Sequence, residues 1–103
     1  MNKVEQEFID KGLAKMRPNG KWFILTREDS IAFVEACKKE SIAILGIDGF
    51  YLREEKIQPS MENGIDFTSS SYNNSKGIYS DAIDFLNQRD RNMYFEIVCL
   101  EDI

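Results

Sequence analysis

An apolar stretch near the middle of the chain, residues 42–52 (IAILGIDGFYL), dominates the hydrophobic pattern. Short apolar runs that contain β-branched residues and have polar flanks are typical of strands buried on both faces. We therefore predict a strand at the centre of the sheet or next to it. Residues 93–100 (MYFEIVCL) have a similar pattern and predict a second inner strand beside the first.

Asp48 interrupts the apolar stretch between two glycines, and the apolar pattern resumes at Phe50. Aspartate is depleted in strands, and a buried carboxylate needs partners. Two interpretations are open. Asp48 either lies at the exposed end of the strand, with Gly49 marking a β-bulge, or lies at a functional edge of the sheet.

The first half of the chain predicts two helices around a short strand. Apolar residues recur with helical spacing over residues 4–16, although Gly12 weakens the second half of this helix and Pro18 must end it. The strand at residues 22–25 (WFIL) follows. Thr26 and the acid three residues later form a variant of the capping box, which starts a helix over residues 28–40. The order strand, helix, strand predicts a βαβ unit with two parallel strands.

The second half predicts a hairpin, a long loop and a third helix. A short strand at residues 55–59 follows the central strand, and Pro59 either restricts it to a sheet edge or ends it. Residues 60–76 (SMENGIDFTSSSYNNSK) have the Ser, Asn, Gly and aromatic content of binding loops. Either a contact loop or a plain surface loop fits them, and the plain loop has room for one short strand at residues 65–68. Residues 76–90 predict a helix.

These elements predict one domain over residues 1–103 of the α/β (α+β) class. We expect a mixed sheet of four to five strands with about three helices, and a length of 103 residues suits a single domain. Cys37 and Cys99 both lie in apolar periodic segments. We expect them to be free thiols in the core of a cytoplasmic protein.

The composition argues against catalysis and against a cofactor or metal. The chain has no histidine, which is the commonest general base and metal ligand. It also has no phosphate-binding glycine loop, nucleophile elbow or paired-cysteine motif. The first residues are polar and acidic, unlike a signal peptide, and no apolar run reaches the length of a membrane helix. We therefore expect a cytoplasmic protein that is not an enzyme and does not contact a membrane.

Charge is distributed unevenly along the chain. Residues 1–53 have a net charge of +1 and residues 54–103 a net charge of −6, and no basic residue lies between Lys56 and Lys76. An acidic half argues against direct binding of nucleic acid, which requires a basic surface. It favours a basic partner, although acidity can also serve solubility alone.

The chain resembles the immunity protein 40 family of small bacterial proteins encoded beside polymorphic toxins. The resemblance lies in IAFVEACKKESIAILGIDGFYL, KIQPSMENGIDF, YSDAIDFLNQ and MYFEIVCL, over about residues 30–100. It implies that the protein binds and neutralises a cognate toxin domain, often a nuclease, in the cytoplasm of the producing cell. A contact-dependent growth-inhibition system is one source of such toxins. The oligomeric state is not implied.

A basic nuclease toxin fits the acidic half of this chain, because proteins that bind phosphate backbones are basic. We expect occlusion of the toxin active site by carboxylates and a few aromatic anchors. The predicted partner-binding residues are Asp48, Glu62, Asp66, Phe67, Tyr72, Asp81 and Asp84. For Phe67 and Tyr72 the alternative is that both rings fold back onto the core as loop anchors.

Two other functions are consistent with the same residues. The first is a small-ligand or regulatory module without catalysis, in which Asp48, Tyr51 and Tyr72 surround an apolar pocket. The second is a structural subunit of an oligomer, which would expose a large apolar patch. A flat or convex acidic surface would favour the immunity function instead.

Overall fold

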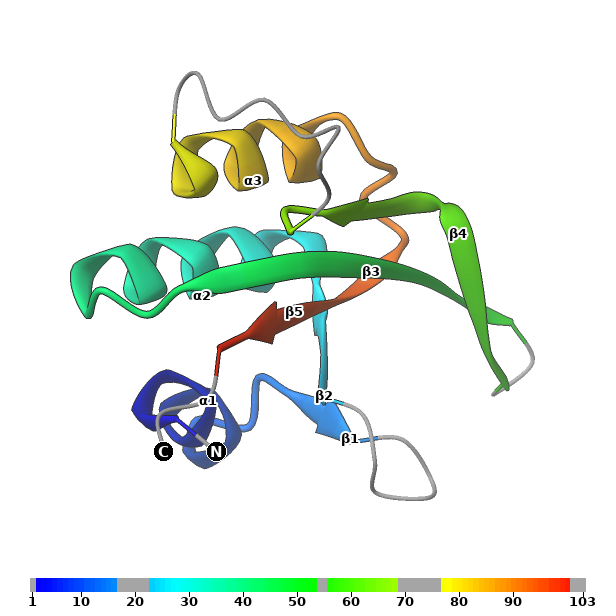
Figure 1. The fold of residues 1–103 in the computed structure, drawn as a ribbon. Helices are drawn as coiled ribbons and strands as arrows, with labels where there is room; N and C mark the ends of the chain where they lie inside the picture. The colour runs from blue at the N-terminus through cyan, green and yellow to red at the C-terminus, as the bar shows by residue number, and fades with distance from the viewer. Residues whose placement is uncertain (1, 17–22, 54–55, 69–76, 101–103) are drawn as a thin grey trace.

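A computed structural model describes residues 2–16, 23–53, 56–68 and 77–100, and these form three helices and five strands (Figure 1). In chain order the elements are α1 (Lys3–Asp10), β1 (Lys15–Met16), β2 (Phe23–Thr26), α2 (Arg27–Lys39), β3 (Ile44–Arg53), β4 (Lys56–Asp66), α3 (Ile78–Asn87) and β5 (Tyr94–Cys99). The predicted class, a single domain with helices and a sheet, is confirmed.

The strands form one sheet in the order β1-β2-β5-β3-β4, and every pairing among the described strands is antiparallel. The prediction of a mixed sheet is therefore wrong. β2 and β3 do run in the same direction on either side of α2, as predicted. However, β5 lies between them and runs opposite to both, so the two parallel strands never pair directly. The predicted positions of β3 and β5, side by side at the middle of the sheet, are confirmed.

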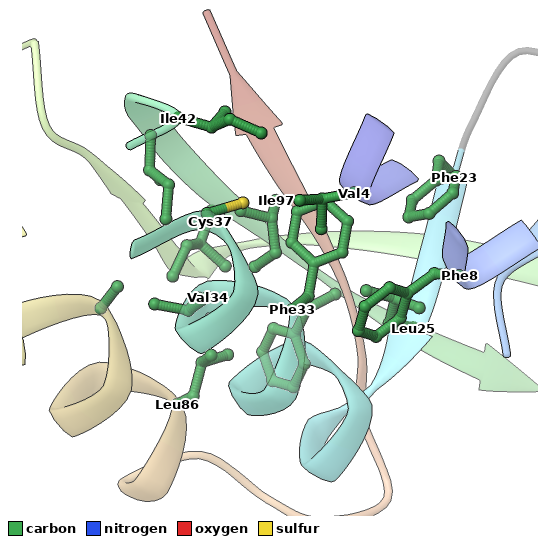
Figure 2. Packing of buried hydrophobic residues seen from close by; sticks show 14 of the residues in the cluster. Val4, Phe8, Phe23, Leu25, Phe33, Val34, Cys37, Ile42, Leu86 and Ile97 are labelled. Atoms are coloured by element: carbon green, nitrogen blue, oxygen red, sulfur yellow. The ribbon is translucent and has the colours of Figure 1, made fainter. Parts of the chain in front are cut away.

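All three helices bury apolar side chains in one core against the sheet face that carries Ile47, Phe95 and Ile97 (Figure 2). Phe33 of α2 is fully buried and its ring contacts that of Phe8 at a centroid separation of 5.1 Å. α2 and α3 lie side by side over this face. Both cysteines reach the core, with Cys37 buried and Cys99 partly buried.

Local sequence signals explain where the first two helices begin and end. Thr26 caps α2 as predicted, because its hydroxyl accepts a hydrogen bond from the backbone N–H of Asp29 at 3.2 Å. α1 is shorter than predicted and ends at Asp10. Gly12 follows with φ +71°, a left-handed conformation that glycine adopts easily and that stops the helix well before Pro18.

β4 is much longer than the predicted strand at residues 55–59, because residues 60–66 also pair with β3. The predicted loop over residues 60–76 is therefore wrong for its first part, and residues 69–76 lie outside the described residues. β4 is an edge strand in the described sheet, which is one of the two outcomes predicted from Pro59, and it does not end at that residue. In Figure 1 the distal half of the β3–β4 hairpin extends beyond the helices.

Candidate functional site

Asp48 lies in the middle of β3, on the face of the sheet opposite the helices. Its neighbours Ile47 and Gly49 are buried, whereas the Asp48 side chain is exposed. Ile47 belongs to the core, and successive side chains of a strand point to opposite faces, so Asp48 points away from the core. Asp48 is thus neither at the end of the strand nor on the edge strand. The first interpretation was right about its exposure but wrong about its position, and the second was wrong about the edge.

The pairing between β3 and β4 is interrupted opposite Asp48. Ile47 pairs with Ile65 and Gly49 with Ser60, so that residues 61–64 of β4 bulge out between the two pairs. Gly49 allows the close approach, because a Cβ there would lie 2.4 Å from the carbonyl oxygen of Asn63. The association of Gly49 with a bulge is confirmed, although the extra residues belong to β4.

Two further carboxylates lie near Asp48 on the same side of the sheet. Asp66 pairs with Gly46, two residues from Asp48, and Glu96 of β5 pairs with Asp48 itself. Glu96 is partly buried, and its carboxylate accepts a hydrogen bond from the backbone N–H of Phe23 at 3.1 Å. Asp48 and Asp66, both exposed, therefore carry the negative charge that this part of the sheet presents to solvent.

The pKa values of the two exposed carboxylates are shifted in opposite directions. Desolvation, and then the negative charge of Asp66, raise the pKa of Asp48 above its ordinary value. The side-chain hydroxyl and backbone N–H of Thr68 donate hydrogen bonds to Asp66 at 2.6 and 2.8 Å, which lower the pKa of Asp66. No described residue donates a hydrogen bond to the Asp48 carboxylate or forms an ion pair with it. Asp48 is therefore a carboxylate whose charge is available to a cation.

Two shallow hollows adjoin Asp48, and both open to solvent. The first, of about 290 Å³, lies beside the bulge and is lined by Asp48, Gly49, Phe50, Pro59, Ser60, Met61 and Gly64. The second, of about 310 Å³, lies on the other side of Asp48 and is lined by Leu45, Gly46, Asp48, Ile65, Asp66, Thr68 and Val98. Neither lining includes a lysine or arginine among the described residues. We call the exposed residues Asp48, Pro59, Met61 and Asp66, which line these hollows, the Asp48 surface.

The bulge exposes some side chains and anchors another. Met61 is 94% exposed and Glu62 is also exposed. Asn63 anchors the bulge on the helix side, because its amide donates to the Ser60 hydroxyl at 2.8 Å and its carbonyl accepts from the Arg89 guanidinium at 3.2 Å. The Arg89 guanidinium also lies 4.2 Å from the Phe85 ring centroid at the end of α3. These contacts connect the Asp48 surface to the helical layer.

The seven predicted partner-binding residues do not form one cluster. Asp48, Glu62 and Asp66 are exposed on β3 and β4. Phe67 is only 7% exposed and belongs to the core, which agrees with the alternative that it is a loop anchor. Asp81 is partly buried and Asp84 is exposed, and both lie on α3, which packs on the opposite face of the sheet. Tyr72 lies outside the described residues.

Sequence reasoning missed Met61, Asn63 and Arg89. Met61 is an apolar residue inside the polar segment SMENG, and the same segment ends in a glycine. That pattern is a usable signal for a strand bulge with an exposed apolar side chain. By contrast, no local signal relates Asn63 to Arg89, because their contact depends on how α3 packs against the sheet.

The predicted pocket around Asp48 and Tyr51 is not formed by these two residues. They are three positions apart on one regular part of β3, so they point to opposite faces. The Tyr51 hydroxyl accepts a hydrogen bond from the Asn63 amide at 3.4 Å on the helix side. In the described part of the chain, no group of three or more His, Cys, Asp or Glu side chains could hold a metal ion.

No helix formed by the described residues is long and apolar enough to cross a membrane. A scan of the chain against models of known protein families finds no match. A search of curated proteins also finds no match.

Proposed function

We propose that this protein is an immunity protein that binds a basic toxin domain through the Asp48 surface and occludes its active site. The observation that carries the proposal is the arrangement at the β3–β4 bulge. Two exposed carboxylates, Asp48 and Asp66, flank one hollow, while the exposed Met61 and Pro59 line the other. A charged surface with an adjacent apolar anchor is suited to a protein partner.

The charge of this surface supports a cationic partner. Lysine or arginine side chains that hold substrate phosphates in a nuclease could pair with Asp48 and Asp66 instead. Asp48 would gain most, because desolvation and Asp66 raise its pKa, and the charge of a nearby cation would favour the ionised carboxylate and offset both effects. Charge pairs that become desolvated at an interface couple by about 1.5–7 kcal/mol, whereas exposed pairs at the rim contribute little.

The shape of the surface also supports a macromolecular partner over a small ligand. Small-molecule sites are usually concave and enclose most of the ligand. The hollows beside Asp48 are open and have volumes of about 290 and 310 Å³. The Met61 side chain, 94% exposed, is a flexible apolar group of the kind that is enriched at interfaces. The resemblance to immunity proteins supports a toxin domain as the partner.

The proposal is tested with the toxin domain encoded next to this chain, in a catalytically inactive form, by titration calorimetry at several salt concentrations. Asp48→Asn and Asp66→Asn each remove one charge, and the asparagine at 66 keeps an acceptor oxygen for Thr68. We expect the double variant to weaken binding at least tenfold at low salt, since it loses two charge-assisted contacts. Its affinity should also depend less on salt.

Glu35→Gln is the matched control, because Glu35 is exposed on α2, on the other side of the sheet. It removes one charge but should leave the affinity within twofold of the original protein. Met61→Ser should weaken binding without changing the salt dependence. The proposal is refuted if no toxin domain is encoded beside this chain, if the encoded domain does not bind, or if the double variant binds as Glu35→Gln does.

A further inference from the structure

Two cysteines far apart in sequence come together where α2 packs on β5. The sulfur atoms of Cys37 and Cys99 are 4.0 Å apart, and 62 positions separate them along the chain. Cys37 is fully buried in the last turns of α2, and Figure 2 shows its sulfur directed toward Ile97 of β5. Cys99 is the last residue of β5 and is only partly buried. A disulfide requires a sulfur separation of about 2 Å, so the two side chains must rotate toward each other by a similar distance.

The environments of the two thiols are unequal. The two thiols share a hydrogen bond in which either sulfur can be the donor. When the Cys37 thiol donates it, the bond lowers the pKa of Cys99. The same bond, together with burial, raises the pKa of Cys37. The carboxylate of Glu5 acts against ionisation of both thiols, but it is a smaller influence on Cys99 than the hydrogen bond. Cys99 is therefore the thiol that ionises first, and it is also the more accessible of the two.

The buried side chain of Asn2 also favours a thiolate at Cys99. The side-chain nitrogen of Asn2 is buried at the start of α1 and has no hydrogen-bond acceptor among the described residues. An unpaired buried donor destabilises the folded state, so its presence calls for an explanation. The same side chain contributes to lowering the pKa of Cys99. Ionised Cys99 would supply the acceptor that this nitrogen lacks.

We propose that Cys37 and Cys99 form a reversible oxidation site, which closes to an intramolecular disulfide in the presence of a low-molecular-weight disulfide. The Cys99 thiolate attacks one sulfur of that disulfide and expels the other as a thiolate, leaving a mixed disulfide on Cys99. Cys37 then attacks the Cys99 sulfur, and its proton passes to the small thiolate that leaves, which releases the second small thiol. Overall, two protein thiols are oxidised to one disulfide, and the small disulfide is reduced to two thiols.

This site is separate from the proposed binding function. Both cysteines lie on the helix-covered side of the sheet, whereas the Asp48 side chain points to the other face. The bond would connect the middle strand of the sheet to the helix that covers it. It would also close a long loop, which restricts the unfolded chain more than the folded one.

The experiment uses the whole reduced chain in glutathione buffers of increasing glutathione disulfide content, with acid quenching, thiol alkylation and mass spectrometry. We expect the native protein to lose the mass of two hydrogen atoms without retaining glutathione. Its melting temperature should rise by roughly 10 °C or more, and dithiothreitol should reverse both changes. The Cys37→Ser variant should instead retain one glutathione, on Cys99, and Cys99→Ser should remain unmodified.

If a serine variant does not fold, the mass and melting temperature of the original protein test the proposal without it. A disulfide that forms only in urea, or a native protein that retains glutathione without closing the ring, overturns it. Equal modification of both single variants in the native state would also overturn it, since the two thiols would then be equivalent.

Discussion

Replacing Phe67 by alanine separates a structural role from a binding role for the segment after β4. Phe67 is 7% exposed and packs in the core formed by the sheet and the helices. Its backbone N–H also donates to the carbonyl oxygen of Leu45 at 2.9 Å, so the ring is held at a defined position beside β3. Removing a buried phenylalanine ring costs about 3–5 kcal/mol, because contacts are lost and a cavity remains.

That loss is a large part of the total stability of a domain of this size, which is about 5–15 kcal/mol. A destabilisation of 1 kcal/mol lowers the melting temperature of a domain of 60–100 residues by roughly 4–8 °C. We therefore expect Phe67→Ala to melt at least about 12 °C below the original protein. Urea denaturation followed by circular dichroism gives the free energy of unfolding directly.

Phe67→Leu is the control, because it keeps an apolar side chain that fills most of the same volume and should lose much less stability. At a temperature where both variants are folded, each should bind the toxin domain with the affinity of the original protein. If Phe67→Ala unfolds at the same urea concentration as the original protein, the ring is not part of the core. If it weakens binding while stability is unchanged, Phe67 contacts the partner and the assignment as an anchor is wrong.

Two further predictions concern β3. Gly49→Ala should lower the free energy of unfolding by about 1–3 kcal/mol in urea denaturation, because the new Cβ would lie 2.4 Å from the Asn63 carbonyl oxygen. Gly64→Ala is the control, and it should lower the free energy of unfolding less because its nearest contact would be at 3.2 Å. Equal losses in the two variants would contradict the assigned bulge. The raised pKa of Asp48 means that the folded state binds its proton more tightly than the unfolded state. The contribution of Asp48 to the free energy of unfolding is therefore fully present below its ordinary pKa of 3.8. This contribution is lost as the pH rises through the pKa that Asp48 has in the folded state. Asp48→Asn should flatten this fall in urea denaturation as the pH rises above 3.8, and an unchanged pH profile would show that the carboxylate is not desolvated.

Local chemistry made several elements predictable from the sequence. Thr26 and Asp29 identify the start of α2, because the cap involves residues three positions apart. Pro59 indicated an edge strand, since proline cannot donate a ladder hydrogen bond. The apolar runs of β3 and β5 indicated inner strands, because both contribute buried residues to the middle of the sheet. In each case the signal and its cause lie in one short segment.

The remaining features depend on contacts between distant segments. The pairing of residues 60–66 with β3 was not predicted, because SMENGID is polar and its strand conformation comes from the partner strand. The burial of Phe67 depends on the helices above it, and the acids of α3 point away from Asp48 only because α3 packs on the other face. The acidic residues in the second half of the sequence therefore predicted the charge of the surface, but not which carboxylates lie on it.

The order of strands has a consequence for how the chain reaches its folded state. β5 is the last described element in the chain, yet it is the strand that joins β2 to β3. Its pairing of Phe95 with Leu25 spans most of the chain, and contacts of high sequence separation slow folding. A nascent or truncated chain that stops before Tyr94 would have two separate strand pairs with unpaired edges, which are prone to aggregation. Productive folding therefore requires the C-terminal segment, and truncation there should be far more damaging than loss of β1, which is the outermost strand on its side of the sheet.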